Sequence, residues 1–310
     1  MGSKRFIPET DIPRLDGKVI LITGGNSGLG LETARQLLKH NPSKIFLACR
    51  SRAKFDQAIS ELQKVSKTDA VCFLALDLAS FSSIKSAAKG FQASSSRLDI
   101  LVNNAGIMMT PEGLTEEGYE IQIGTNHMGH AFLTHLLLPT LENTTKLKVS
   151  SDVRIIFLAS AGEMMASNDP YKFDQFKTTM PGISTVARYG ISKLANIHYA
   201  AALAQQRQNI KVISIHPGIV RTNLGGPVIE NSLLLGAMTR LSNLFVAVEA
   251  SKGALNQLWA MTAPEVESGV FYHPVGVKGK GSKLSQDKSL QQTLWEWTQG
   301  EMQKYLDENA

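Results

Sequence analysis

Short apolar runs alternate with segments of helical spacing along most of the chain. The apolar runs predict strands at residues 18–23, 44–49, 70–76, 98–102, 153–159, 210–215 and 269–273. Between them, apolar residues recur at helical spacing and predict helices at 31–40, 53–65, 80–93, 119–141, 187–206 and 251–262, with a mostly helical end at 284–306. Such alternation is typical of a parallel sheet. We therefore expect an α/β protein with a doubly wound parallel sheet, right-handed crossovers and helices on both faces.

No linker interrupts this alternation. The chain has 310 residues and 43% hydrophobic content, enough for a well-filled core. We expect a short N-terminal extension, residues 1–16, and a single domain at 17–310.

Composition narrows the class of protein. The 32 Lys and Arg against 27 Asp and Glu leave a net charge of +5, and these charges are scattered, which makes nucleic acid an unexpected partner. The two cysteines, Cys49 and Cys72, lie in strand-like runs and argue against a disulfide framework and for a reducing compartment. The histidines at 127, 130 and 135 have no metal-site spacing, so no metal is expected.

Membrane and targeting signals are weak. Residues 1–16 carry charges and no apolar core of signal-peptide length. The longest apolar stretch, 232–250, is interrupted by Arg240, Asn243 and Glu249 and is too polar to span a bilayer. We expect a cytoplasmic protein without a transmembrane segment, and peripheral membrane contact stays open.

A glycine-rich turn follows the first expected strand. Gly24, Gly28 and Gly30 lie where the strand must turn into a helix, so that backbone N–H groups and the helix N-terminus can approach a pyrophosphate. The alternative is an ordinary strand-to-helix loop. The residues expected to hold a dinucleotide here are Gly24, Asn26, Ser27, Gly28, Leu29 and Gly30.

The end of the second strand bears on the cofactor. A fold selective for NAD usually carries an acid there, and this chain has Cys49 instead. Arg50 and Arg52 follow, and a guanidinium can pair with the 2′-phosphate of NADP. They could also be solvated charges at a helix start. We favour NADP(H) as the cofactor.

The next two strands end in polar or small residues. Asp77 and Leu78 follow the third strand, where a carboxylate can accept from an adenine amino group or cap the next helix. Asn104, Ala105 and Gly106 follow the fourth, leaving room for a ribose, although such a turn is common.

Tyr189 and Lys193 lie four residues apart and so share one face of a helix. A nearby ammonium can stabilise a phenolate, which makes a tyrosine usable in proton transfer. Ser160 ends the fifth strand and could hold a substrate oxygen, or serve as a cap or turn residue. Asn126, within an expected helix, could anchor a water that relays protons to Lys193 or satisfy a buried carbonyl.

The order of these motifs resembles that of the short-chain dehydrogenases/reductases, over residues 17 to about 274. The motifs are TGGNSGLG at 23–30, NNAG at 103–106, Asn126, Ser160, YGISK at 189–193 and HPG at 216–218. The resemblance implies a single-domain Rossmann fold in which Tyr189 exchanges the proton, Lys193 lowers its pKa and Ser160 positions the carbonyl. It implies that Asn126 supports the relay, that Tyr189 and Lys193 also contact the cofactor, and that a nicotinamide loop contains Pro217, Gly218, Val220 and Thr222.

Within that family, the LACR at 47–50, SKLAN at 192–196 and HPGIVRT at 216–222 are most similar to the retinol dehydrogenase and protochlorophyllide reductase-like branch, which favours NADP(H). Ser160 and Tyr189 are further apart than is common. The extra segment, 163–187, could roof an apolar pocket or pack onto the domain. The apolar segment 225–248 resembles the family's substrate lid, and the helices at 119–141 and 187–206 its usual faces for a homodimer or homotetramer.

We therefore expect an oxidoreductase that transfers a hydride between NADPH and the carbonyl or alcohol of an apolar small molecule. Steroid, retinoid and polyketide compounds are candidate substrates. A polyketide substrate would place the enzyme in secondary metabolism. Two other functions stay open: a catalytically idle NADP-binding scaffold or sensor, and reduction of an activated carbon–carbon double bond.

Overall fold

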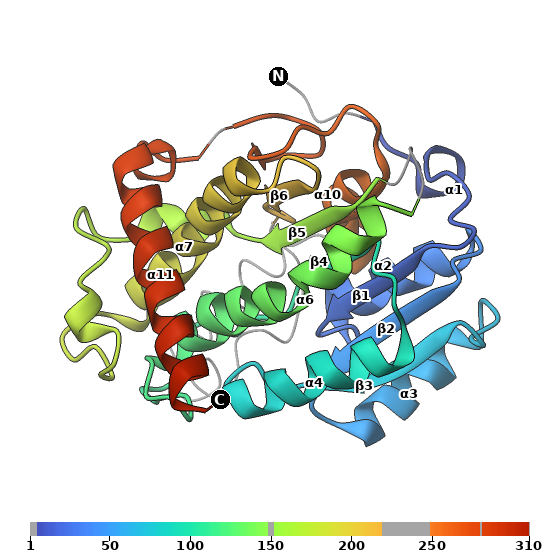
Figure 1. The fold of residues 1–310 in the computed structure, drawn as a ribbon. Coiled ribbons are helices and arrows are strands. Elements are labelled where there is room, and N and C mark those ends of the chain that lie inside the picture. Colours follow the sequence, from blue (N-terminus) through green and yellow to red (C-terminus); the bar gives the residue numbers. More distant parts are fainter. Residues whose placement is uncertain (1–4, 148–151, 219–248, 280, 310) are drawn as a thin grey trace, which may run out of the picture.

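A parallel sheet forms the centre of the molecule (Figure 1). The computed structural model describes residues 5–147, 152–218, 249–279 and 281–309. Seven strands pair in the order β3-β2-β1-β4-β5-β6-β7, and every pairing is parallel. The strands are β1 (Val19–Thr23), β2 (Lys44–Cys49), β3 (Val71–Ala75), β4 (Ile100–Asn103), β5 (Arg154–Leu158), β6 (Lys211–Ile215) and β7 (Phe271–Tyr272). This order confirms the expected doubly wound Rossmann-type sheet.

Helices cover both faces of the sheet. The α-helices are α1 (Pro8–Asp11), α2 (Gly28–Leu38), α3 (Arg52–Leu62), α4 (Phe81–Ser94), α5 (Ile121–Ile123), α6 (Gly129–Thr145), α7 (Thr185–Gln206), α10 (Ala250–Thr262) and α11 (Lys288–Glu308). Adjacent strand residues enter opposite cores, so Leu21 packs with α4, α6 and α7, whereas Ile20 packs with α2, α3 and α10. Because both sides are buried, the strands are continuous apolar runs.

The helix expected at 119–141 is divided in the structure. Glu120 caps a short α5 by accepting from the backbone N–H groups of Gln122 and Ile123. Residues Gly124–Met128 then form one π-helical turn, η1, before α6 begins. A π turn widens the helix locally, and such turns are frequent at functional sites. The periodicity of apolar residues could not show this extra residue in the turn.

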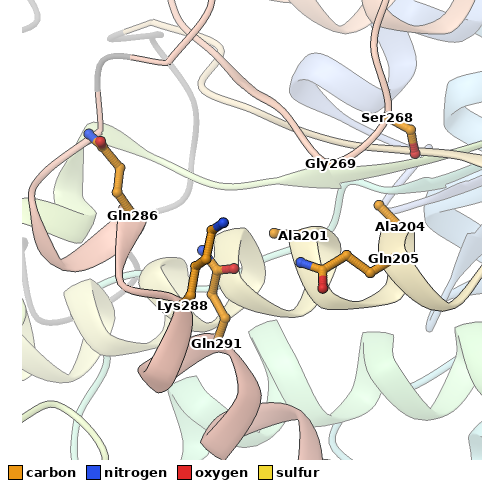
Figure 2. A pocket seen from close by; sticks show the side chains of 8 residues that line it. All are labelled: Ala201, Ala204, Gln205, Ser268, Gly269, Gln286, Lys288 and Gln291. Atoms are coloured by element: carbon orange, nitrogen blue, oxygen red, sulfur yellow. The ribbon is translucent and has the colours of Figure 1, made fainter.

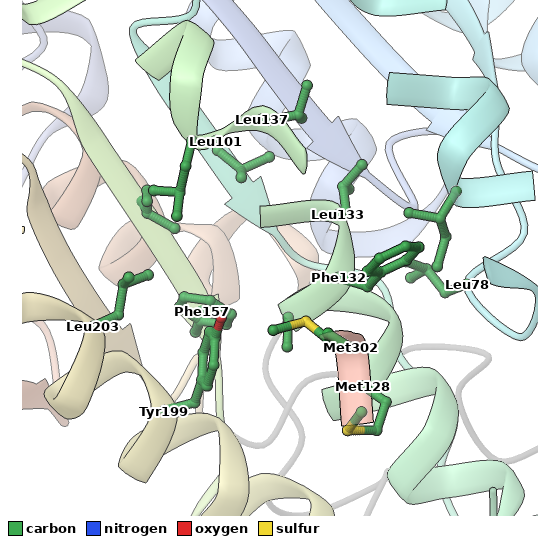
Figure 3. Packing of buried hydrophobic residues seen from close by; sticks show 14 of the residues in the cluster. Leu78, Leu101, Met128, Phe132, Leu133, Leu137, Phe157, Tyr199, Leu203 and Met302 are labelled. Atoms are coloured by element: carbon green, nitrogen blue, oxygen red, sulfur yellow. The ribbon is translucent and has the colours of Figure 1, made fainter. Parts of the chain in front are cut away.

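The C-terminal helix α11 lies against α7 (Figure 1). Leu294 is fully buried and Met302 nearly so, and Met302 lies close to Tyr199 and Phe157 in the core (Figure 3). The indole of Trp295 stacks on the ring of Tyr199 with centroids 5.2 Å apart. Thus α11 covers one face of α7, one of the two helices at which we expected a second subunit.

The segment 163–187 packs mainly onto the domain. It contains two short 3-10 turns, one of them η3 (Phe173–Gln175) and the other the end of η2 (Ala161–Met165). Phe176 and Met180 are buried, and Phe173 stacks on Trp297 at 4.9 Å. The segment was expected either to roof an apolar pocket or to pack onto the domain, and its aromatic residues pack onto the domain. The expected lid at 225–248 lies outside the described residues.

The described part of the N-terminal extension is packed onto the domain. Phe6, Ile12 and Leu15 are buried in the core beside α2, and the backbone N–H of Leu15 donates to the carbonyl of His40 at 2.7 Å. Among the described helices, none is long and apolar enough to cross a membrane.

Candidate active site

The glycine turn after β1 is built for close backbone approach. Gly24 has φ of +64°, and a Cβ on it would lie 3.1 Å from the Cα of Ala105. A Cβ on Gly30 would lie 2.5 Å from the carbonyl oxygen of Gly24 and 2.7 Å from the side-chain nitrogen of Asn104. Any side chain at these positions would push the turn away from the segment that follows β4.

The N-terminus of α2 opens from this turn. Ser27 is its N-cap residue and, within the described structure, its side chain makes no capping hydrogen bond. Ser27 and Gly28 are exposed, Asn26 is half-buried and Leu29 is buried. The first N–H groups of the helix and its positive dipole end are therefore available to an anion, as a pyrophosphate would require.

Thr23 joins the ends of β1 and β4, a role that sequence reasoning missed. Its hydroxyl oxygen accepts from the backbone N–H groups of Asn104 and Ala105, each at 2.9 Å. It also lies 2.9 Å from Nε2 of buried His130, and Asn104 Nδ2 donates to the Thr23 carbonyl at 2.7 Å. Asn104 Oδ1 is buried without a partner among the described residues, so it can accept from a ligand.

Arg50 and Arg52 differ in their freedom to bind an anion. Arg50 is 75% exposed, and its guanidinium lies 4.0 Å from the carboxylate of Asp77. Arg52 donates to Asp56 at 2.9 Å and lies over the ring of Phe73 at 5.4 Å. Arg50 is therefore the cation that remains adjustable at the end of β2.

Asp77 and Leu78 are placed differently from one another. Asp77 accepts from the backbone N–H of Ala79 at 3.0 Å, so its carboxylate shapes this turn while staying 41% exposed. Leu78 is buried against Phe132 in the core (Figure 3). Only its backbone could therefore reach a cofactor.

Asn126 lies in the π turn and is fully buried. Its Oδ1 accepts from the N–H of Ile107, and its Nδ2 donates to the Ile107 carbonyl, both at 2.9 Å. Nδ2 also donates to the Ser192 hydroxyl at 2.9 Å. The side chain thus fixes the segment after β4 against α7, and its bond to the Ile107 carbonyl agrees with the expected alternative that Asn126 satisfies a buried carbonyl.

Ser160 and Tyr189 face one another across a glycine. The Ser160 hydroxyl caps η2 by accepting from the N–H of Gly162 at 3.0 Å. A Cβ on Gly162 would lie 2.8 Å from Cε1 of Tyr189, so the phenol ring rests on this turn. Burial raises the pKa of Tyr189, and its hydrogen bond with Ser160 lowers it in part.

Lys193 lies beside the same phenol. Its Nζ is 5.7 Å from the centre of the Tyr189 ring and donates to the Leu158 carbonyl at 3.0 Å. Gly106 leaves room for it, because a Cβ there would lie 3.4 Å from Nζ. Burial lowers the pKa of Lys193 to about 8. The ammonium is thus charged at neutral pH and close to releasing a proton.

The end of β6 completes this edge of the sheet. The carbonyl of His216 accepts from the side chain of Asn256 at 2.9 Å. Pro217 and Gly218 follow, both half-buried, and Gly218 has φ of +89°. The positions of Val220 and Thr222 lie outside the described residues.

A separate hollow of about 340 Å³ opens between the second half of α7 and the start of α11 (Figure 2). Its lining includes Ala201, Gln205, Gln286 and Lys288. Ala201 is twelve residues after Tyr189, or about 18 Å along the helix. This hollow is therefore not part of the catalytic arrangement.

Comparison with known proteins agrees with this geometry. Residues 18–171 match the short chain dehydrogenase family. A short-chain dehydrogenase/reductase of Armillaria gallica is 37% identical over 95% of this chain and 93% of its own, and retinol dehydrogenase 12 of Homo sapiens is 36% identical over 84% and 78%. A solved structure of an uncharacterised protein from Mycobacterium paratuberculosis superimposes with a TM-score of 0.74 at 27% identity, covering 95% of this chain and 97% of that one. The chain is thus an oxidoreductase of the short-chain dehydrogenase/reductase family.

Proposed function

We propose that the protein is an NADP(H)-dependent carbonyl reductase, and in reverse an alcohol dehydrogenase, for apolar small molecules. The observation that carries this proposal is the meeting of Ser160, Tyr189 and Lys193 at the carboxyl edge of the sheet, where ligands of such folds bind. The glycine turn and the open N-terminus of α2 lie at the same edge.

The residues present fit a dinucleotide. The space that a Cβ would fill at Gly24 and Gly30 and the unpartnered Oδ1 of Asn104 are features of a backbone cradle. The residues that would hold the pyrophosphate are Gly24, Asn26, Ser27, Gly28, Leu29 and Gly30. Those that would hold the adenine, riboses and nicotinamide are Asp77, Leu78, Asn104, Ala105, Gly106, Tyr189, Lys193, Pro217, Gly218, Val220 and Thr222.

The preference for NADP(H) rests on Arg50. The acid that would favour NAD is replaced by Cys49, and Arg50 is exposed with its guanidinium near Asp77. A 2′-phosphate would give this guanidinium a charge-assisted hydrogen bond. The guanidinium of Arg52 is held by Asp56 and the Phe73 ring. Arg52 therefore adds positive charge near the 2′-phosphate and makes no direct contact with it.

In the reductive direction, the Ser160 hydroxyl holds the substrate oxygen and Tyr189 donates a proton to it. When bound, the nicotinamide supplies the hydride. Once Tyr189 has given up its proton, Lys193 stabilises the resulting phenolate. The pKa of Lys193, lowered to about 8, suits the return of a proton to Tyr189. Asn126 fixes the segment that borders Lys193, and this support of the relay through position is the part we assign to it.

Product analysis with deuterated NADPH tests the proposal. Apolar aldehydes and ketones, including steroid, retinoid and polyketide compounds, are incubated with the enzyme and the labelled cofactor. We expect one deuterium on the carbinol carbon of an alcohol product. Deuterium on a former alkene carbon would assign the enzyme to double-bond reduction, and NADPH binding without consumption across the panel would assign it to a scaffold.

A further inference from the structure

Two segments that border α7, the helix of Tyr189, each carry a pair of methionines. Residues 106–110 follow β4 and contain Met108 and Met109, and residues 161–166 follow β5 and contain Met164 and Met165. Strands β4 and β5 are parallel neighbours in the sheet. The two segments therefore leave the sheet at the same edge, and four of the ten methionines in the chain lie there.

The first segment has a fixed backbone. The N–H of Met109 donates to the side chain of Gln122 at 2.9 Å, and the carbonyl of Thr110 accepts from the hydroxyl of Thr185 at 2.9 Å. Thr185 is the first residue of α7, the helix that carries Tyr189. The segment thus runs beside the start of this helix, with Met108 and Met109 half-buried.

The second segment lies against the same helix through glycines. A Cβ on Gly190 would lie 2.8 Å from the backbone carbon of Met165, and one on Gly162 would lie 2.8 Å from the Tyr189 ring. This close backbone contact leaves no space for side chains between the turn and α7. Met164 and Met165 are accordingly 64% and 52% exposed.

The two segments offer a ligand apolar surface and little charge. Glu163 is the only charged residue in them, and its carboxylate is buried with both oxygens accepting from Ser282. Methionine side chains are unbranched, flexible and polarisable, so they adapt to apolar ligands of different shape. The backbone of both segments is fixed, whereas their apolar side chains can adapt. This combination suits a site that keeps the Tyr189 phenol in place and accepts substrates with varied substituents.

We propose that Met108, Met109, Met164 and Met165 form a methionine rim that receives the apolar part of the substrate. The rim determines specificity by apolar length and bulk, so the preferred substrates are carbonyl compounds whose substituents are long or polycyclic and lack polar groups next to the carbonyl. This inference rests on the proposed reductase function.

Straight-chain aldehydes from hexanal to decanal test the rim. With the wild-type enzyme and NADPH, kcat/KM is expected to rise about two- to fourfold per methylene, as burial of each methylene in an apolar site predicts. In the double variant M164Q/M165Q, kcat/KM for decanal falls at least tenfold through KM, while that for hexanal changes less than threefold. Met108→Gln lowers the value for decanal in the same way.

Two controls separate the rim from a general effect. The variant M164L/M165L keeps apolar side chains and stays within threefold of the wild type for every aldehyde. Val65→Gln makes the same apolar-to-amide change at a side chain that is 55% exposed after α3 and leaves all kinetic constants unchanged. An unaltered chain-length dependence in M164Q/M165Q overturns the rim and leaves the reductase function standing. Absence of turnover for every aldehyde in the wild type overturns the rim, and absence of turnover for the ketones of the deuterium-transfer panel as well overturns both.

Discussion

At the scale of single residues, burial decides what the catalytic groups can do. The four-residue spacing of Tyr189 and Lys193 predicts that they share a helix face, and the 5.7 Å between the Lys193 ammonium and the Tyr189 ring agrees. Sequence cannot show that Lys193 also donates to the Leu158 carbonyl, because that bond depends on the packing of α7 on β5. Burial in this packing raises the pKa of Tyr189 and lowers that of Lys193.

The first prediction concerns the cost of burying Lys193. Its pKa falls from 10.5 to about 8 in the folded chain. Below pH 8, Lys193 is protonated in both the folded and the unfolded chain, and its buried charge destabilises the fold. Between pH 8 and 10.5 the unfolded chain binds more protons than the folded one. The contribution of Lys193 to the free energy of unfolding therefore rises with pH in this range. Lys193→Met should therefore be more stable than the wild type at pH 7, by on the order of 1–3 kcal/mol in urea unfolding.

The gain should shrink when the unfolding experiment is repeated at pH 10. Lys89→Met, at an exposed position of α4, is the control and should change the free energy of unfolding by less than about 0.5 kcal/mol at either pH. A difference between Lys193→Met and the wild type that is the same at pH 7 and pH 10 would contradict the lowered pKa.

The second prediction concerns the cofactor. Arg50→Gln should weaken NADPH binding about 10- to 100-fold, the loss expected for one hydrogen bond to a charged phosphate, and leave NADH binding nearly unchanged. Arg52→Gln is the matched control, and its effect should stay below threefold because Arg52 is held by Asp56 and Phe73. Dissociation constants from fluorescence titration check both. Equal losses for NADPH and NADH would remove Arg50 from the 2′-phosphate.

At the scale of elements, the sequence predicts strands better than it predicts irregular turns. All seven expected strands coincide with observed ones to within two residues at each end, although β7 shortens from five expected residues to Phe271–Tyr272. The π turn at Gly124–Met128 contains Asn126, whose side chain bonds to Ile107, nineteen residues earlier, and local apolar spacing cannot predict a contact over that separation. The apolar and aromatic residues of 163–187 are equally compatible with a pocket roof and with core packing. The contacts of Phe173 and Phe176 with Trp297, far away in the sequence, show that these aromatic residues pack onto the domain.

The third prediction tests the π turn. Asn126→Ala leaves the buried N–H and carbonyl of Ile107 without their side-chain partners and should lower the free energy of unfolding by about 2–4 kcal/mol. Turnover should fall as well, because residues 106–110 border Lys193. Asn143→Ala, exposed near the end of α6, is the control and should alter neither property. Unfolding and turnover of Asn126→Ala equal to those of the wild type would contradict its structural part.

At the scale of the whole molecule, the course of the C-terminus changes the expectation for assembly. The helices at 119–141 and 187–206 were expected to face a second subunit. In the structure α11 packs along α7, with Trp295 on Tyr199, and reaches the other helix through Thr298, 3.0 Å from Nε2 of buried His127. Sequence shows that α11 has apolar residues but not which surface they cover. The sheet order, by contrast, follows from the strand and helix alternation together with the motifs.

The fourth prediction is that the protein in solution is a monomer. Because α11 packs on α7 and touches His127 and Phe132, pairing of two copies on this face would require displacement of α11 and exposure of Leu294 and Met302. Light scattering after size-exclusion chromatography should give the mass of one chain, 33.7 kDa. Twice that mass or more, independent of protein concentration, would restore the expected homodimer or homotetramer.

The central claim is that Tyr189 exchanges the proton in a carbonyl reduction that uses NADPH. The most direct measurement compares turnover by Tyr189→Phe and wild type with a carbonyl substrate found by deuterium transfer, alongside NADPH binding. We predict at least a hundredfold lower kcat, the loss typical of a missing general acid, with the NADPH dissociation constant within threefold of the wild type. Tyr305→Phe, whose ring packs on Phe81 and Phe132, should retain full turnover. Unchanged turnover by Tyr189→Phe would contradict the claim.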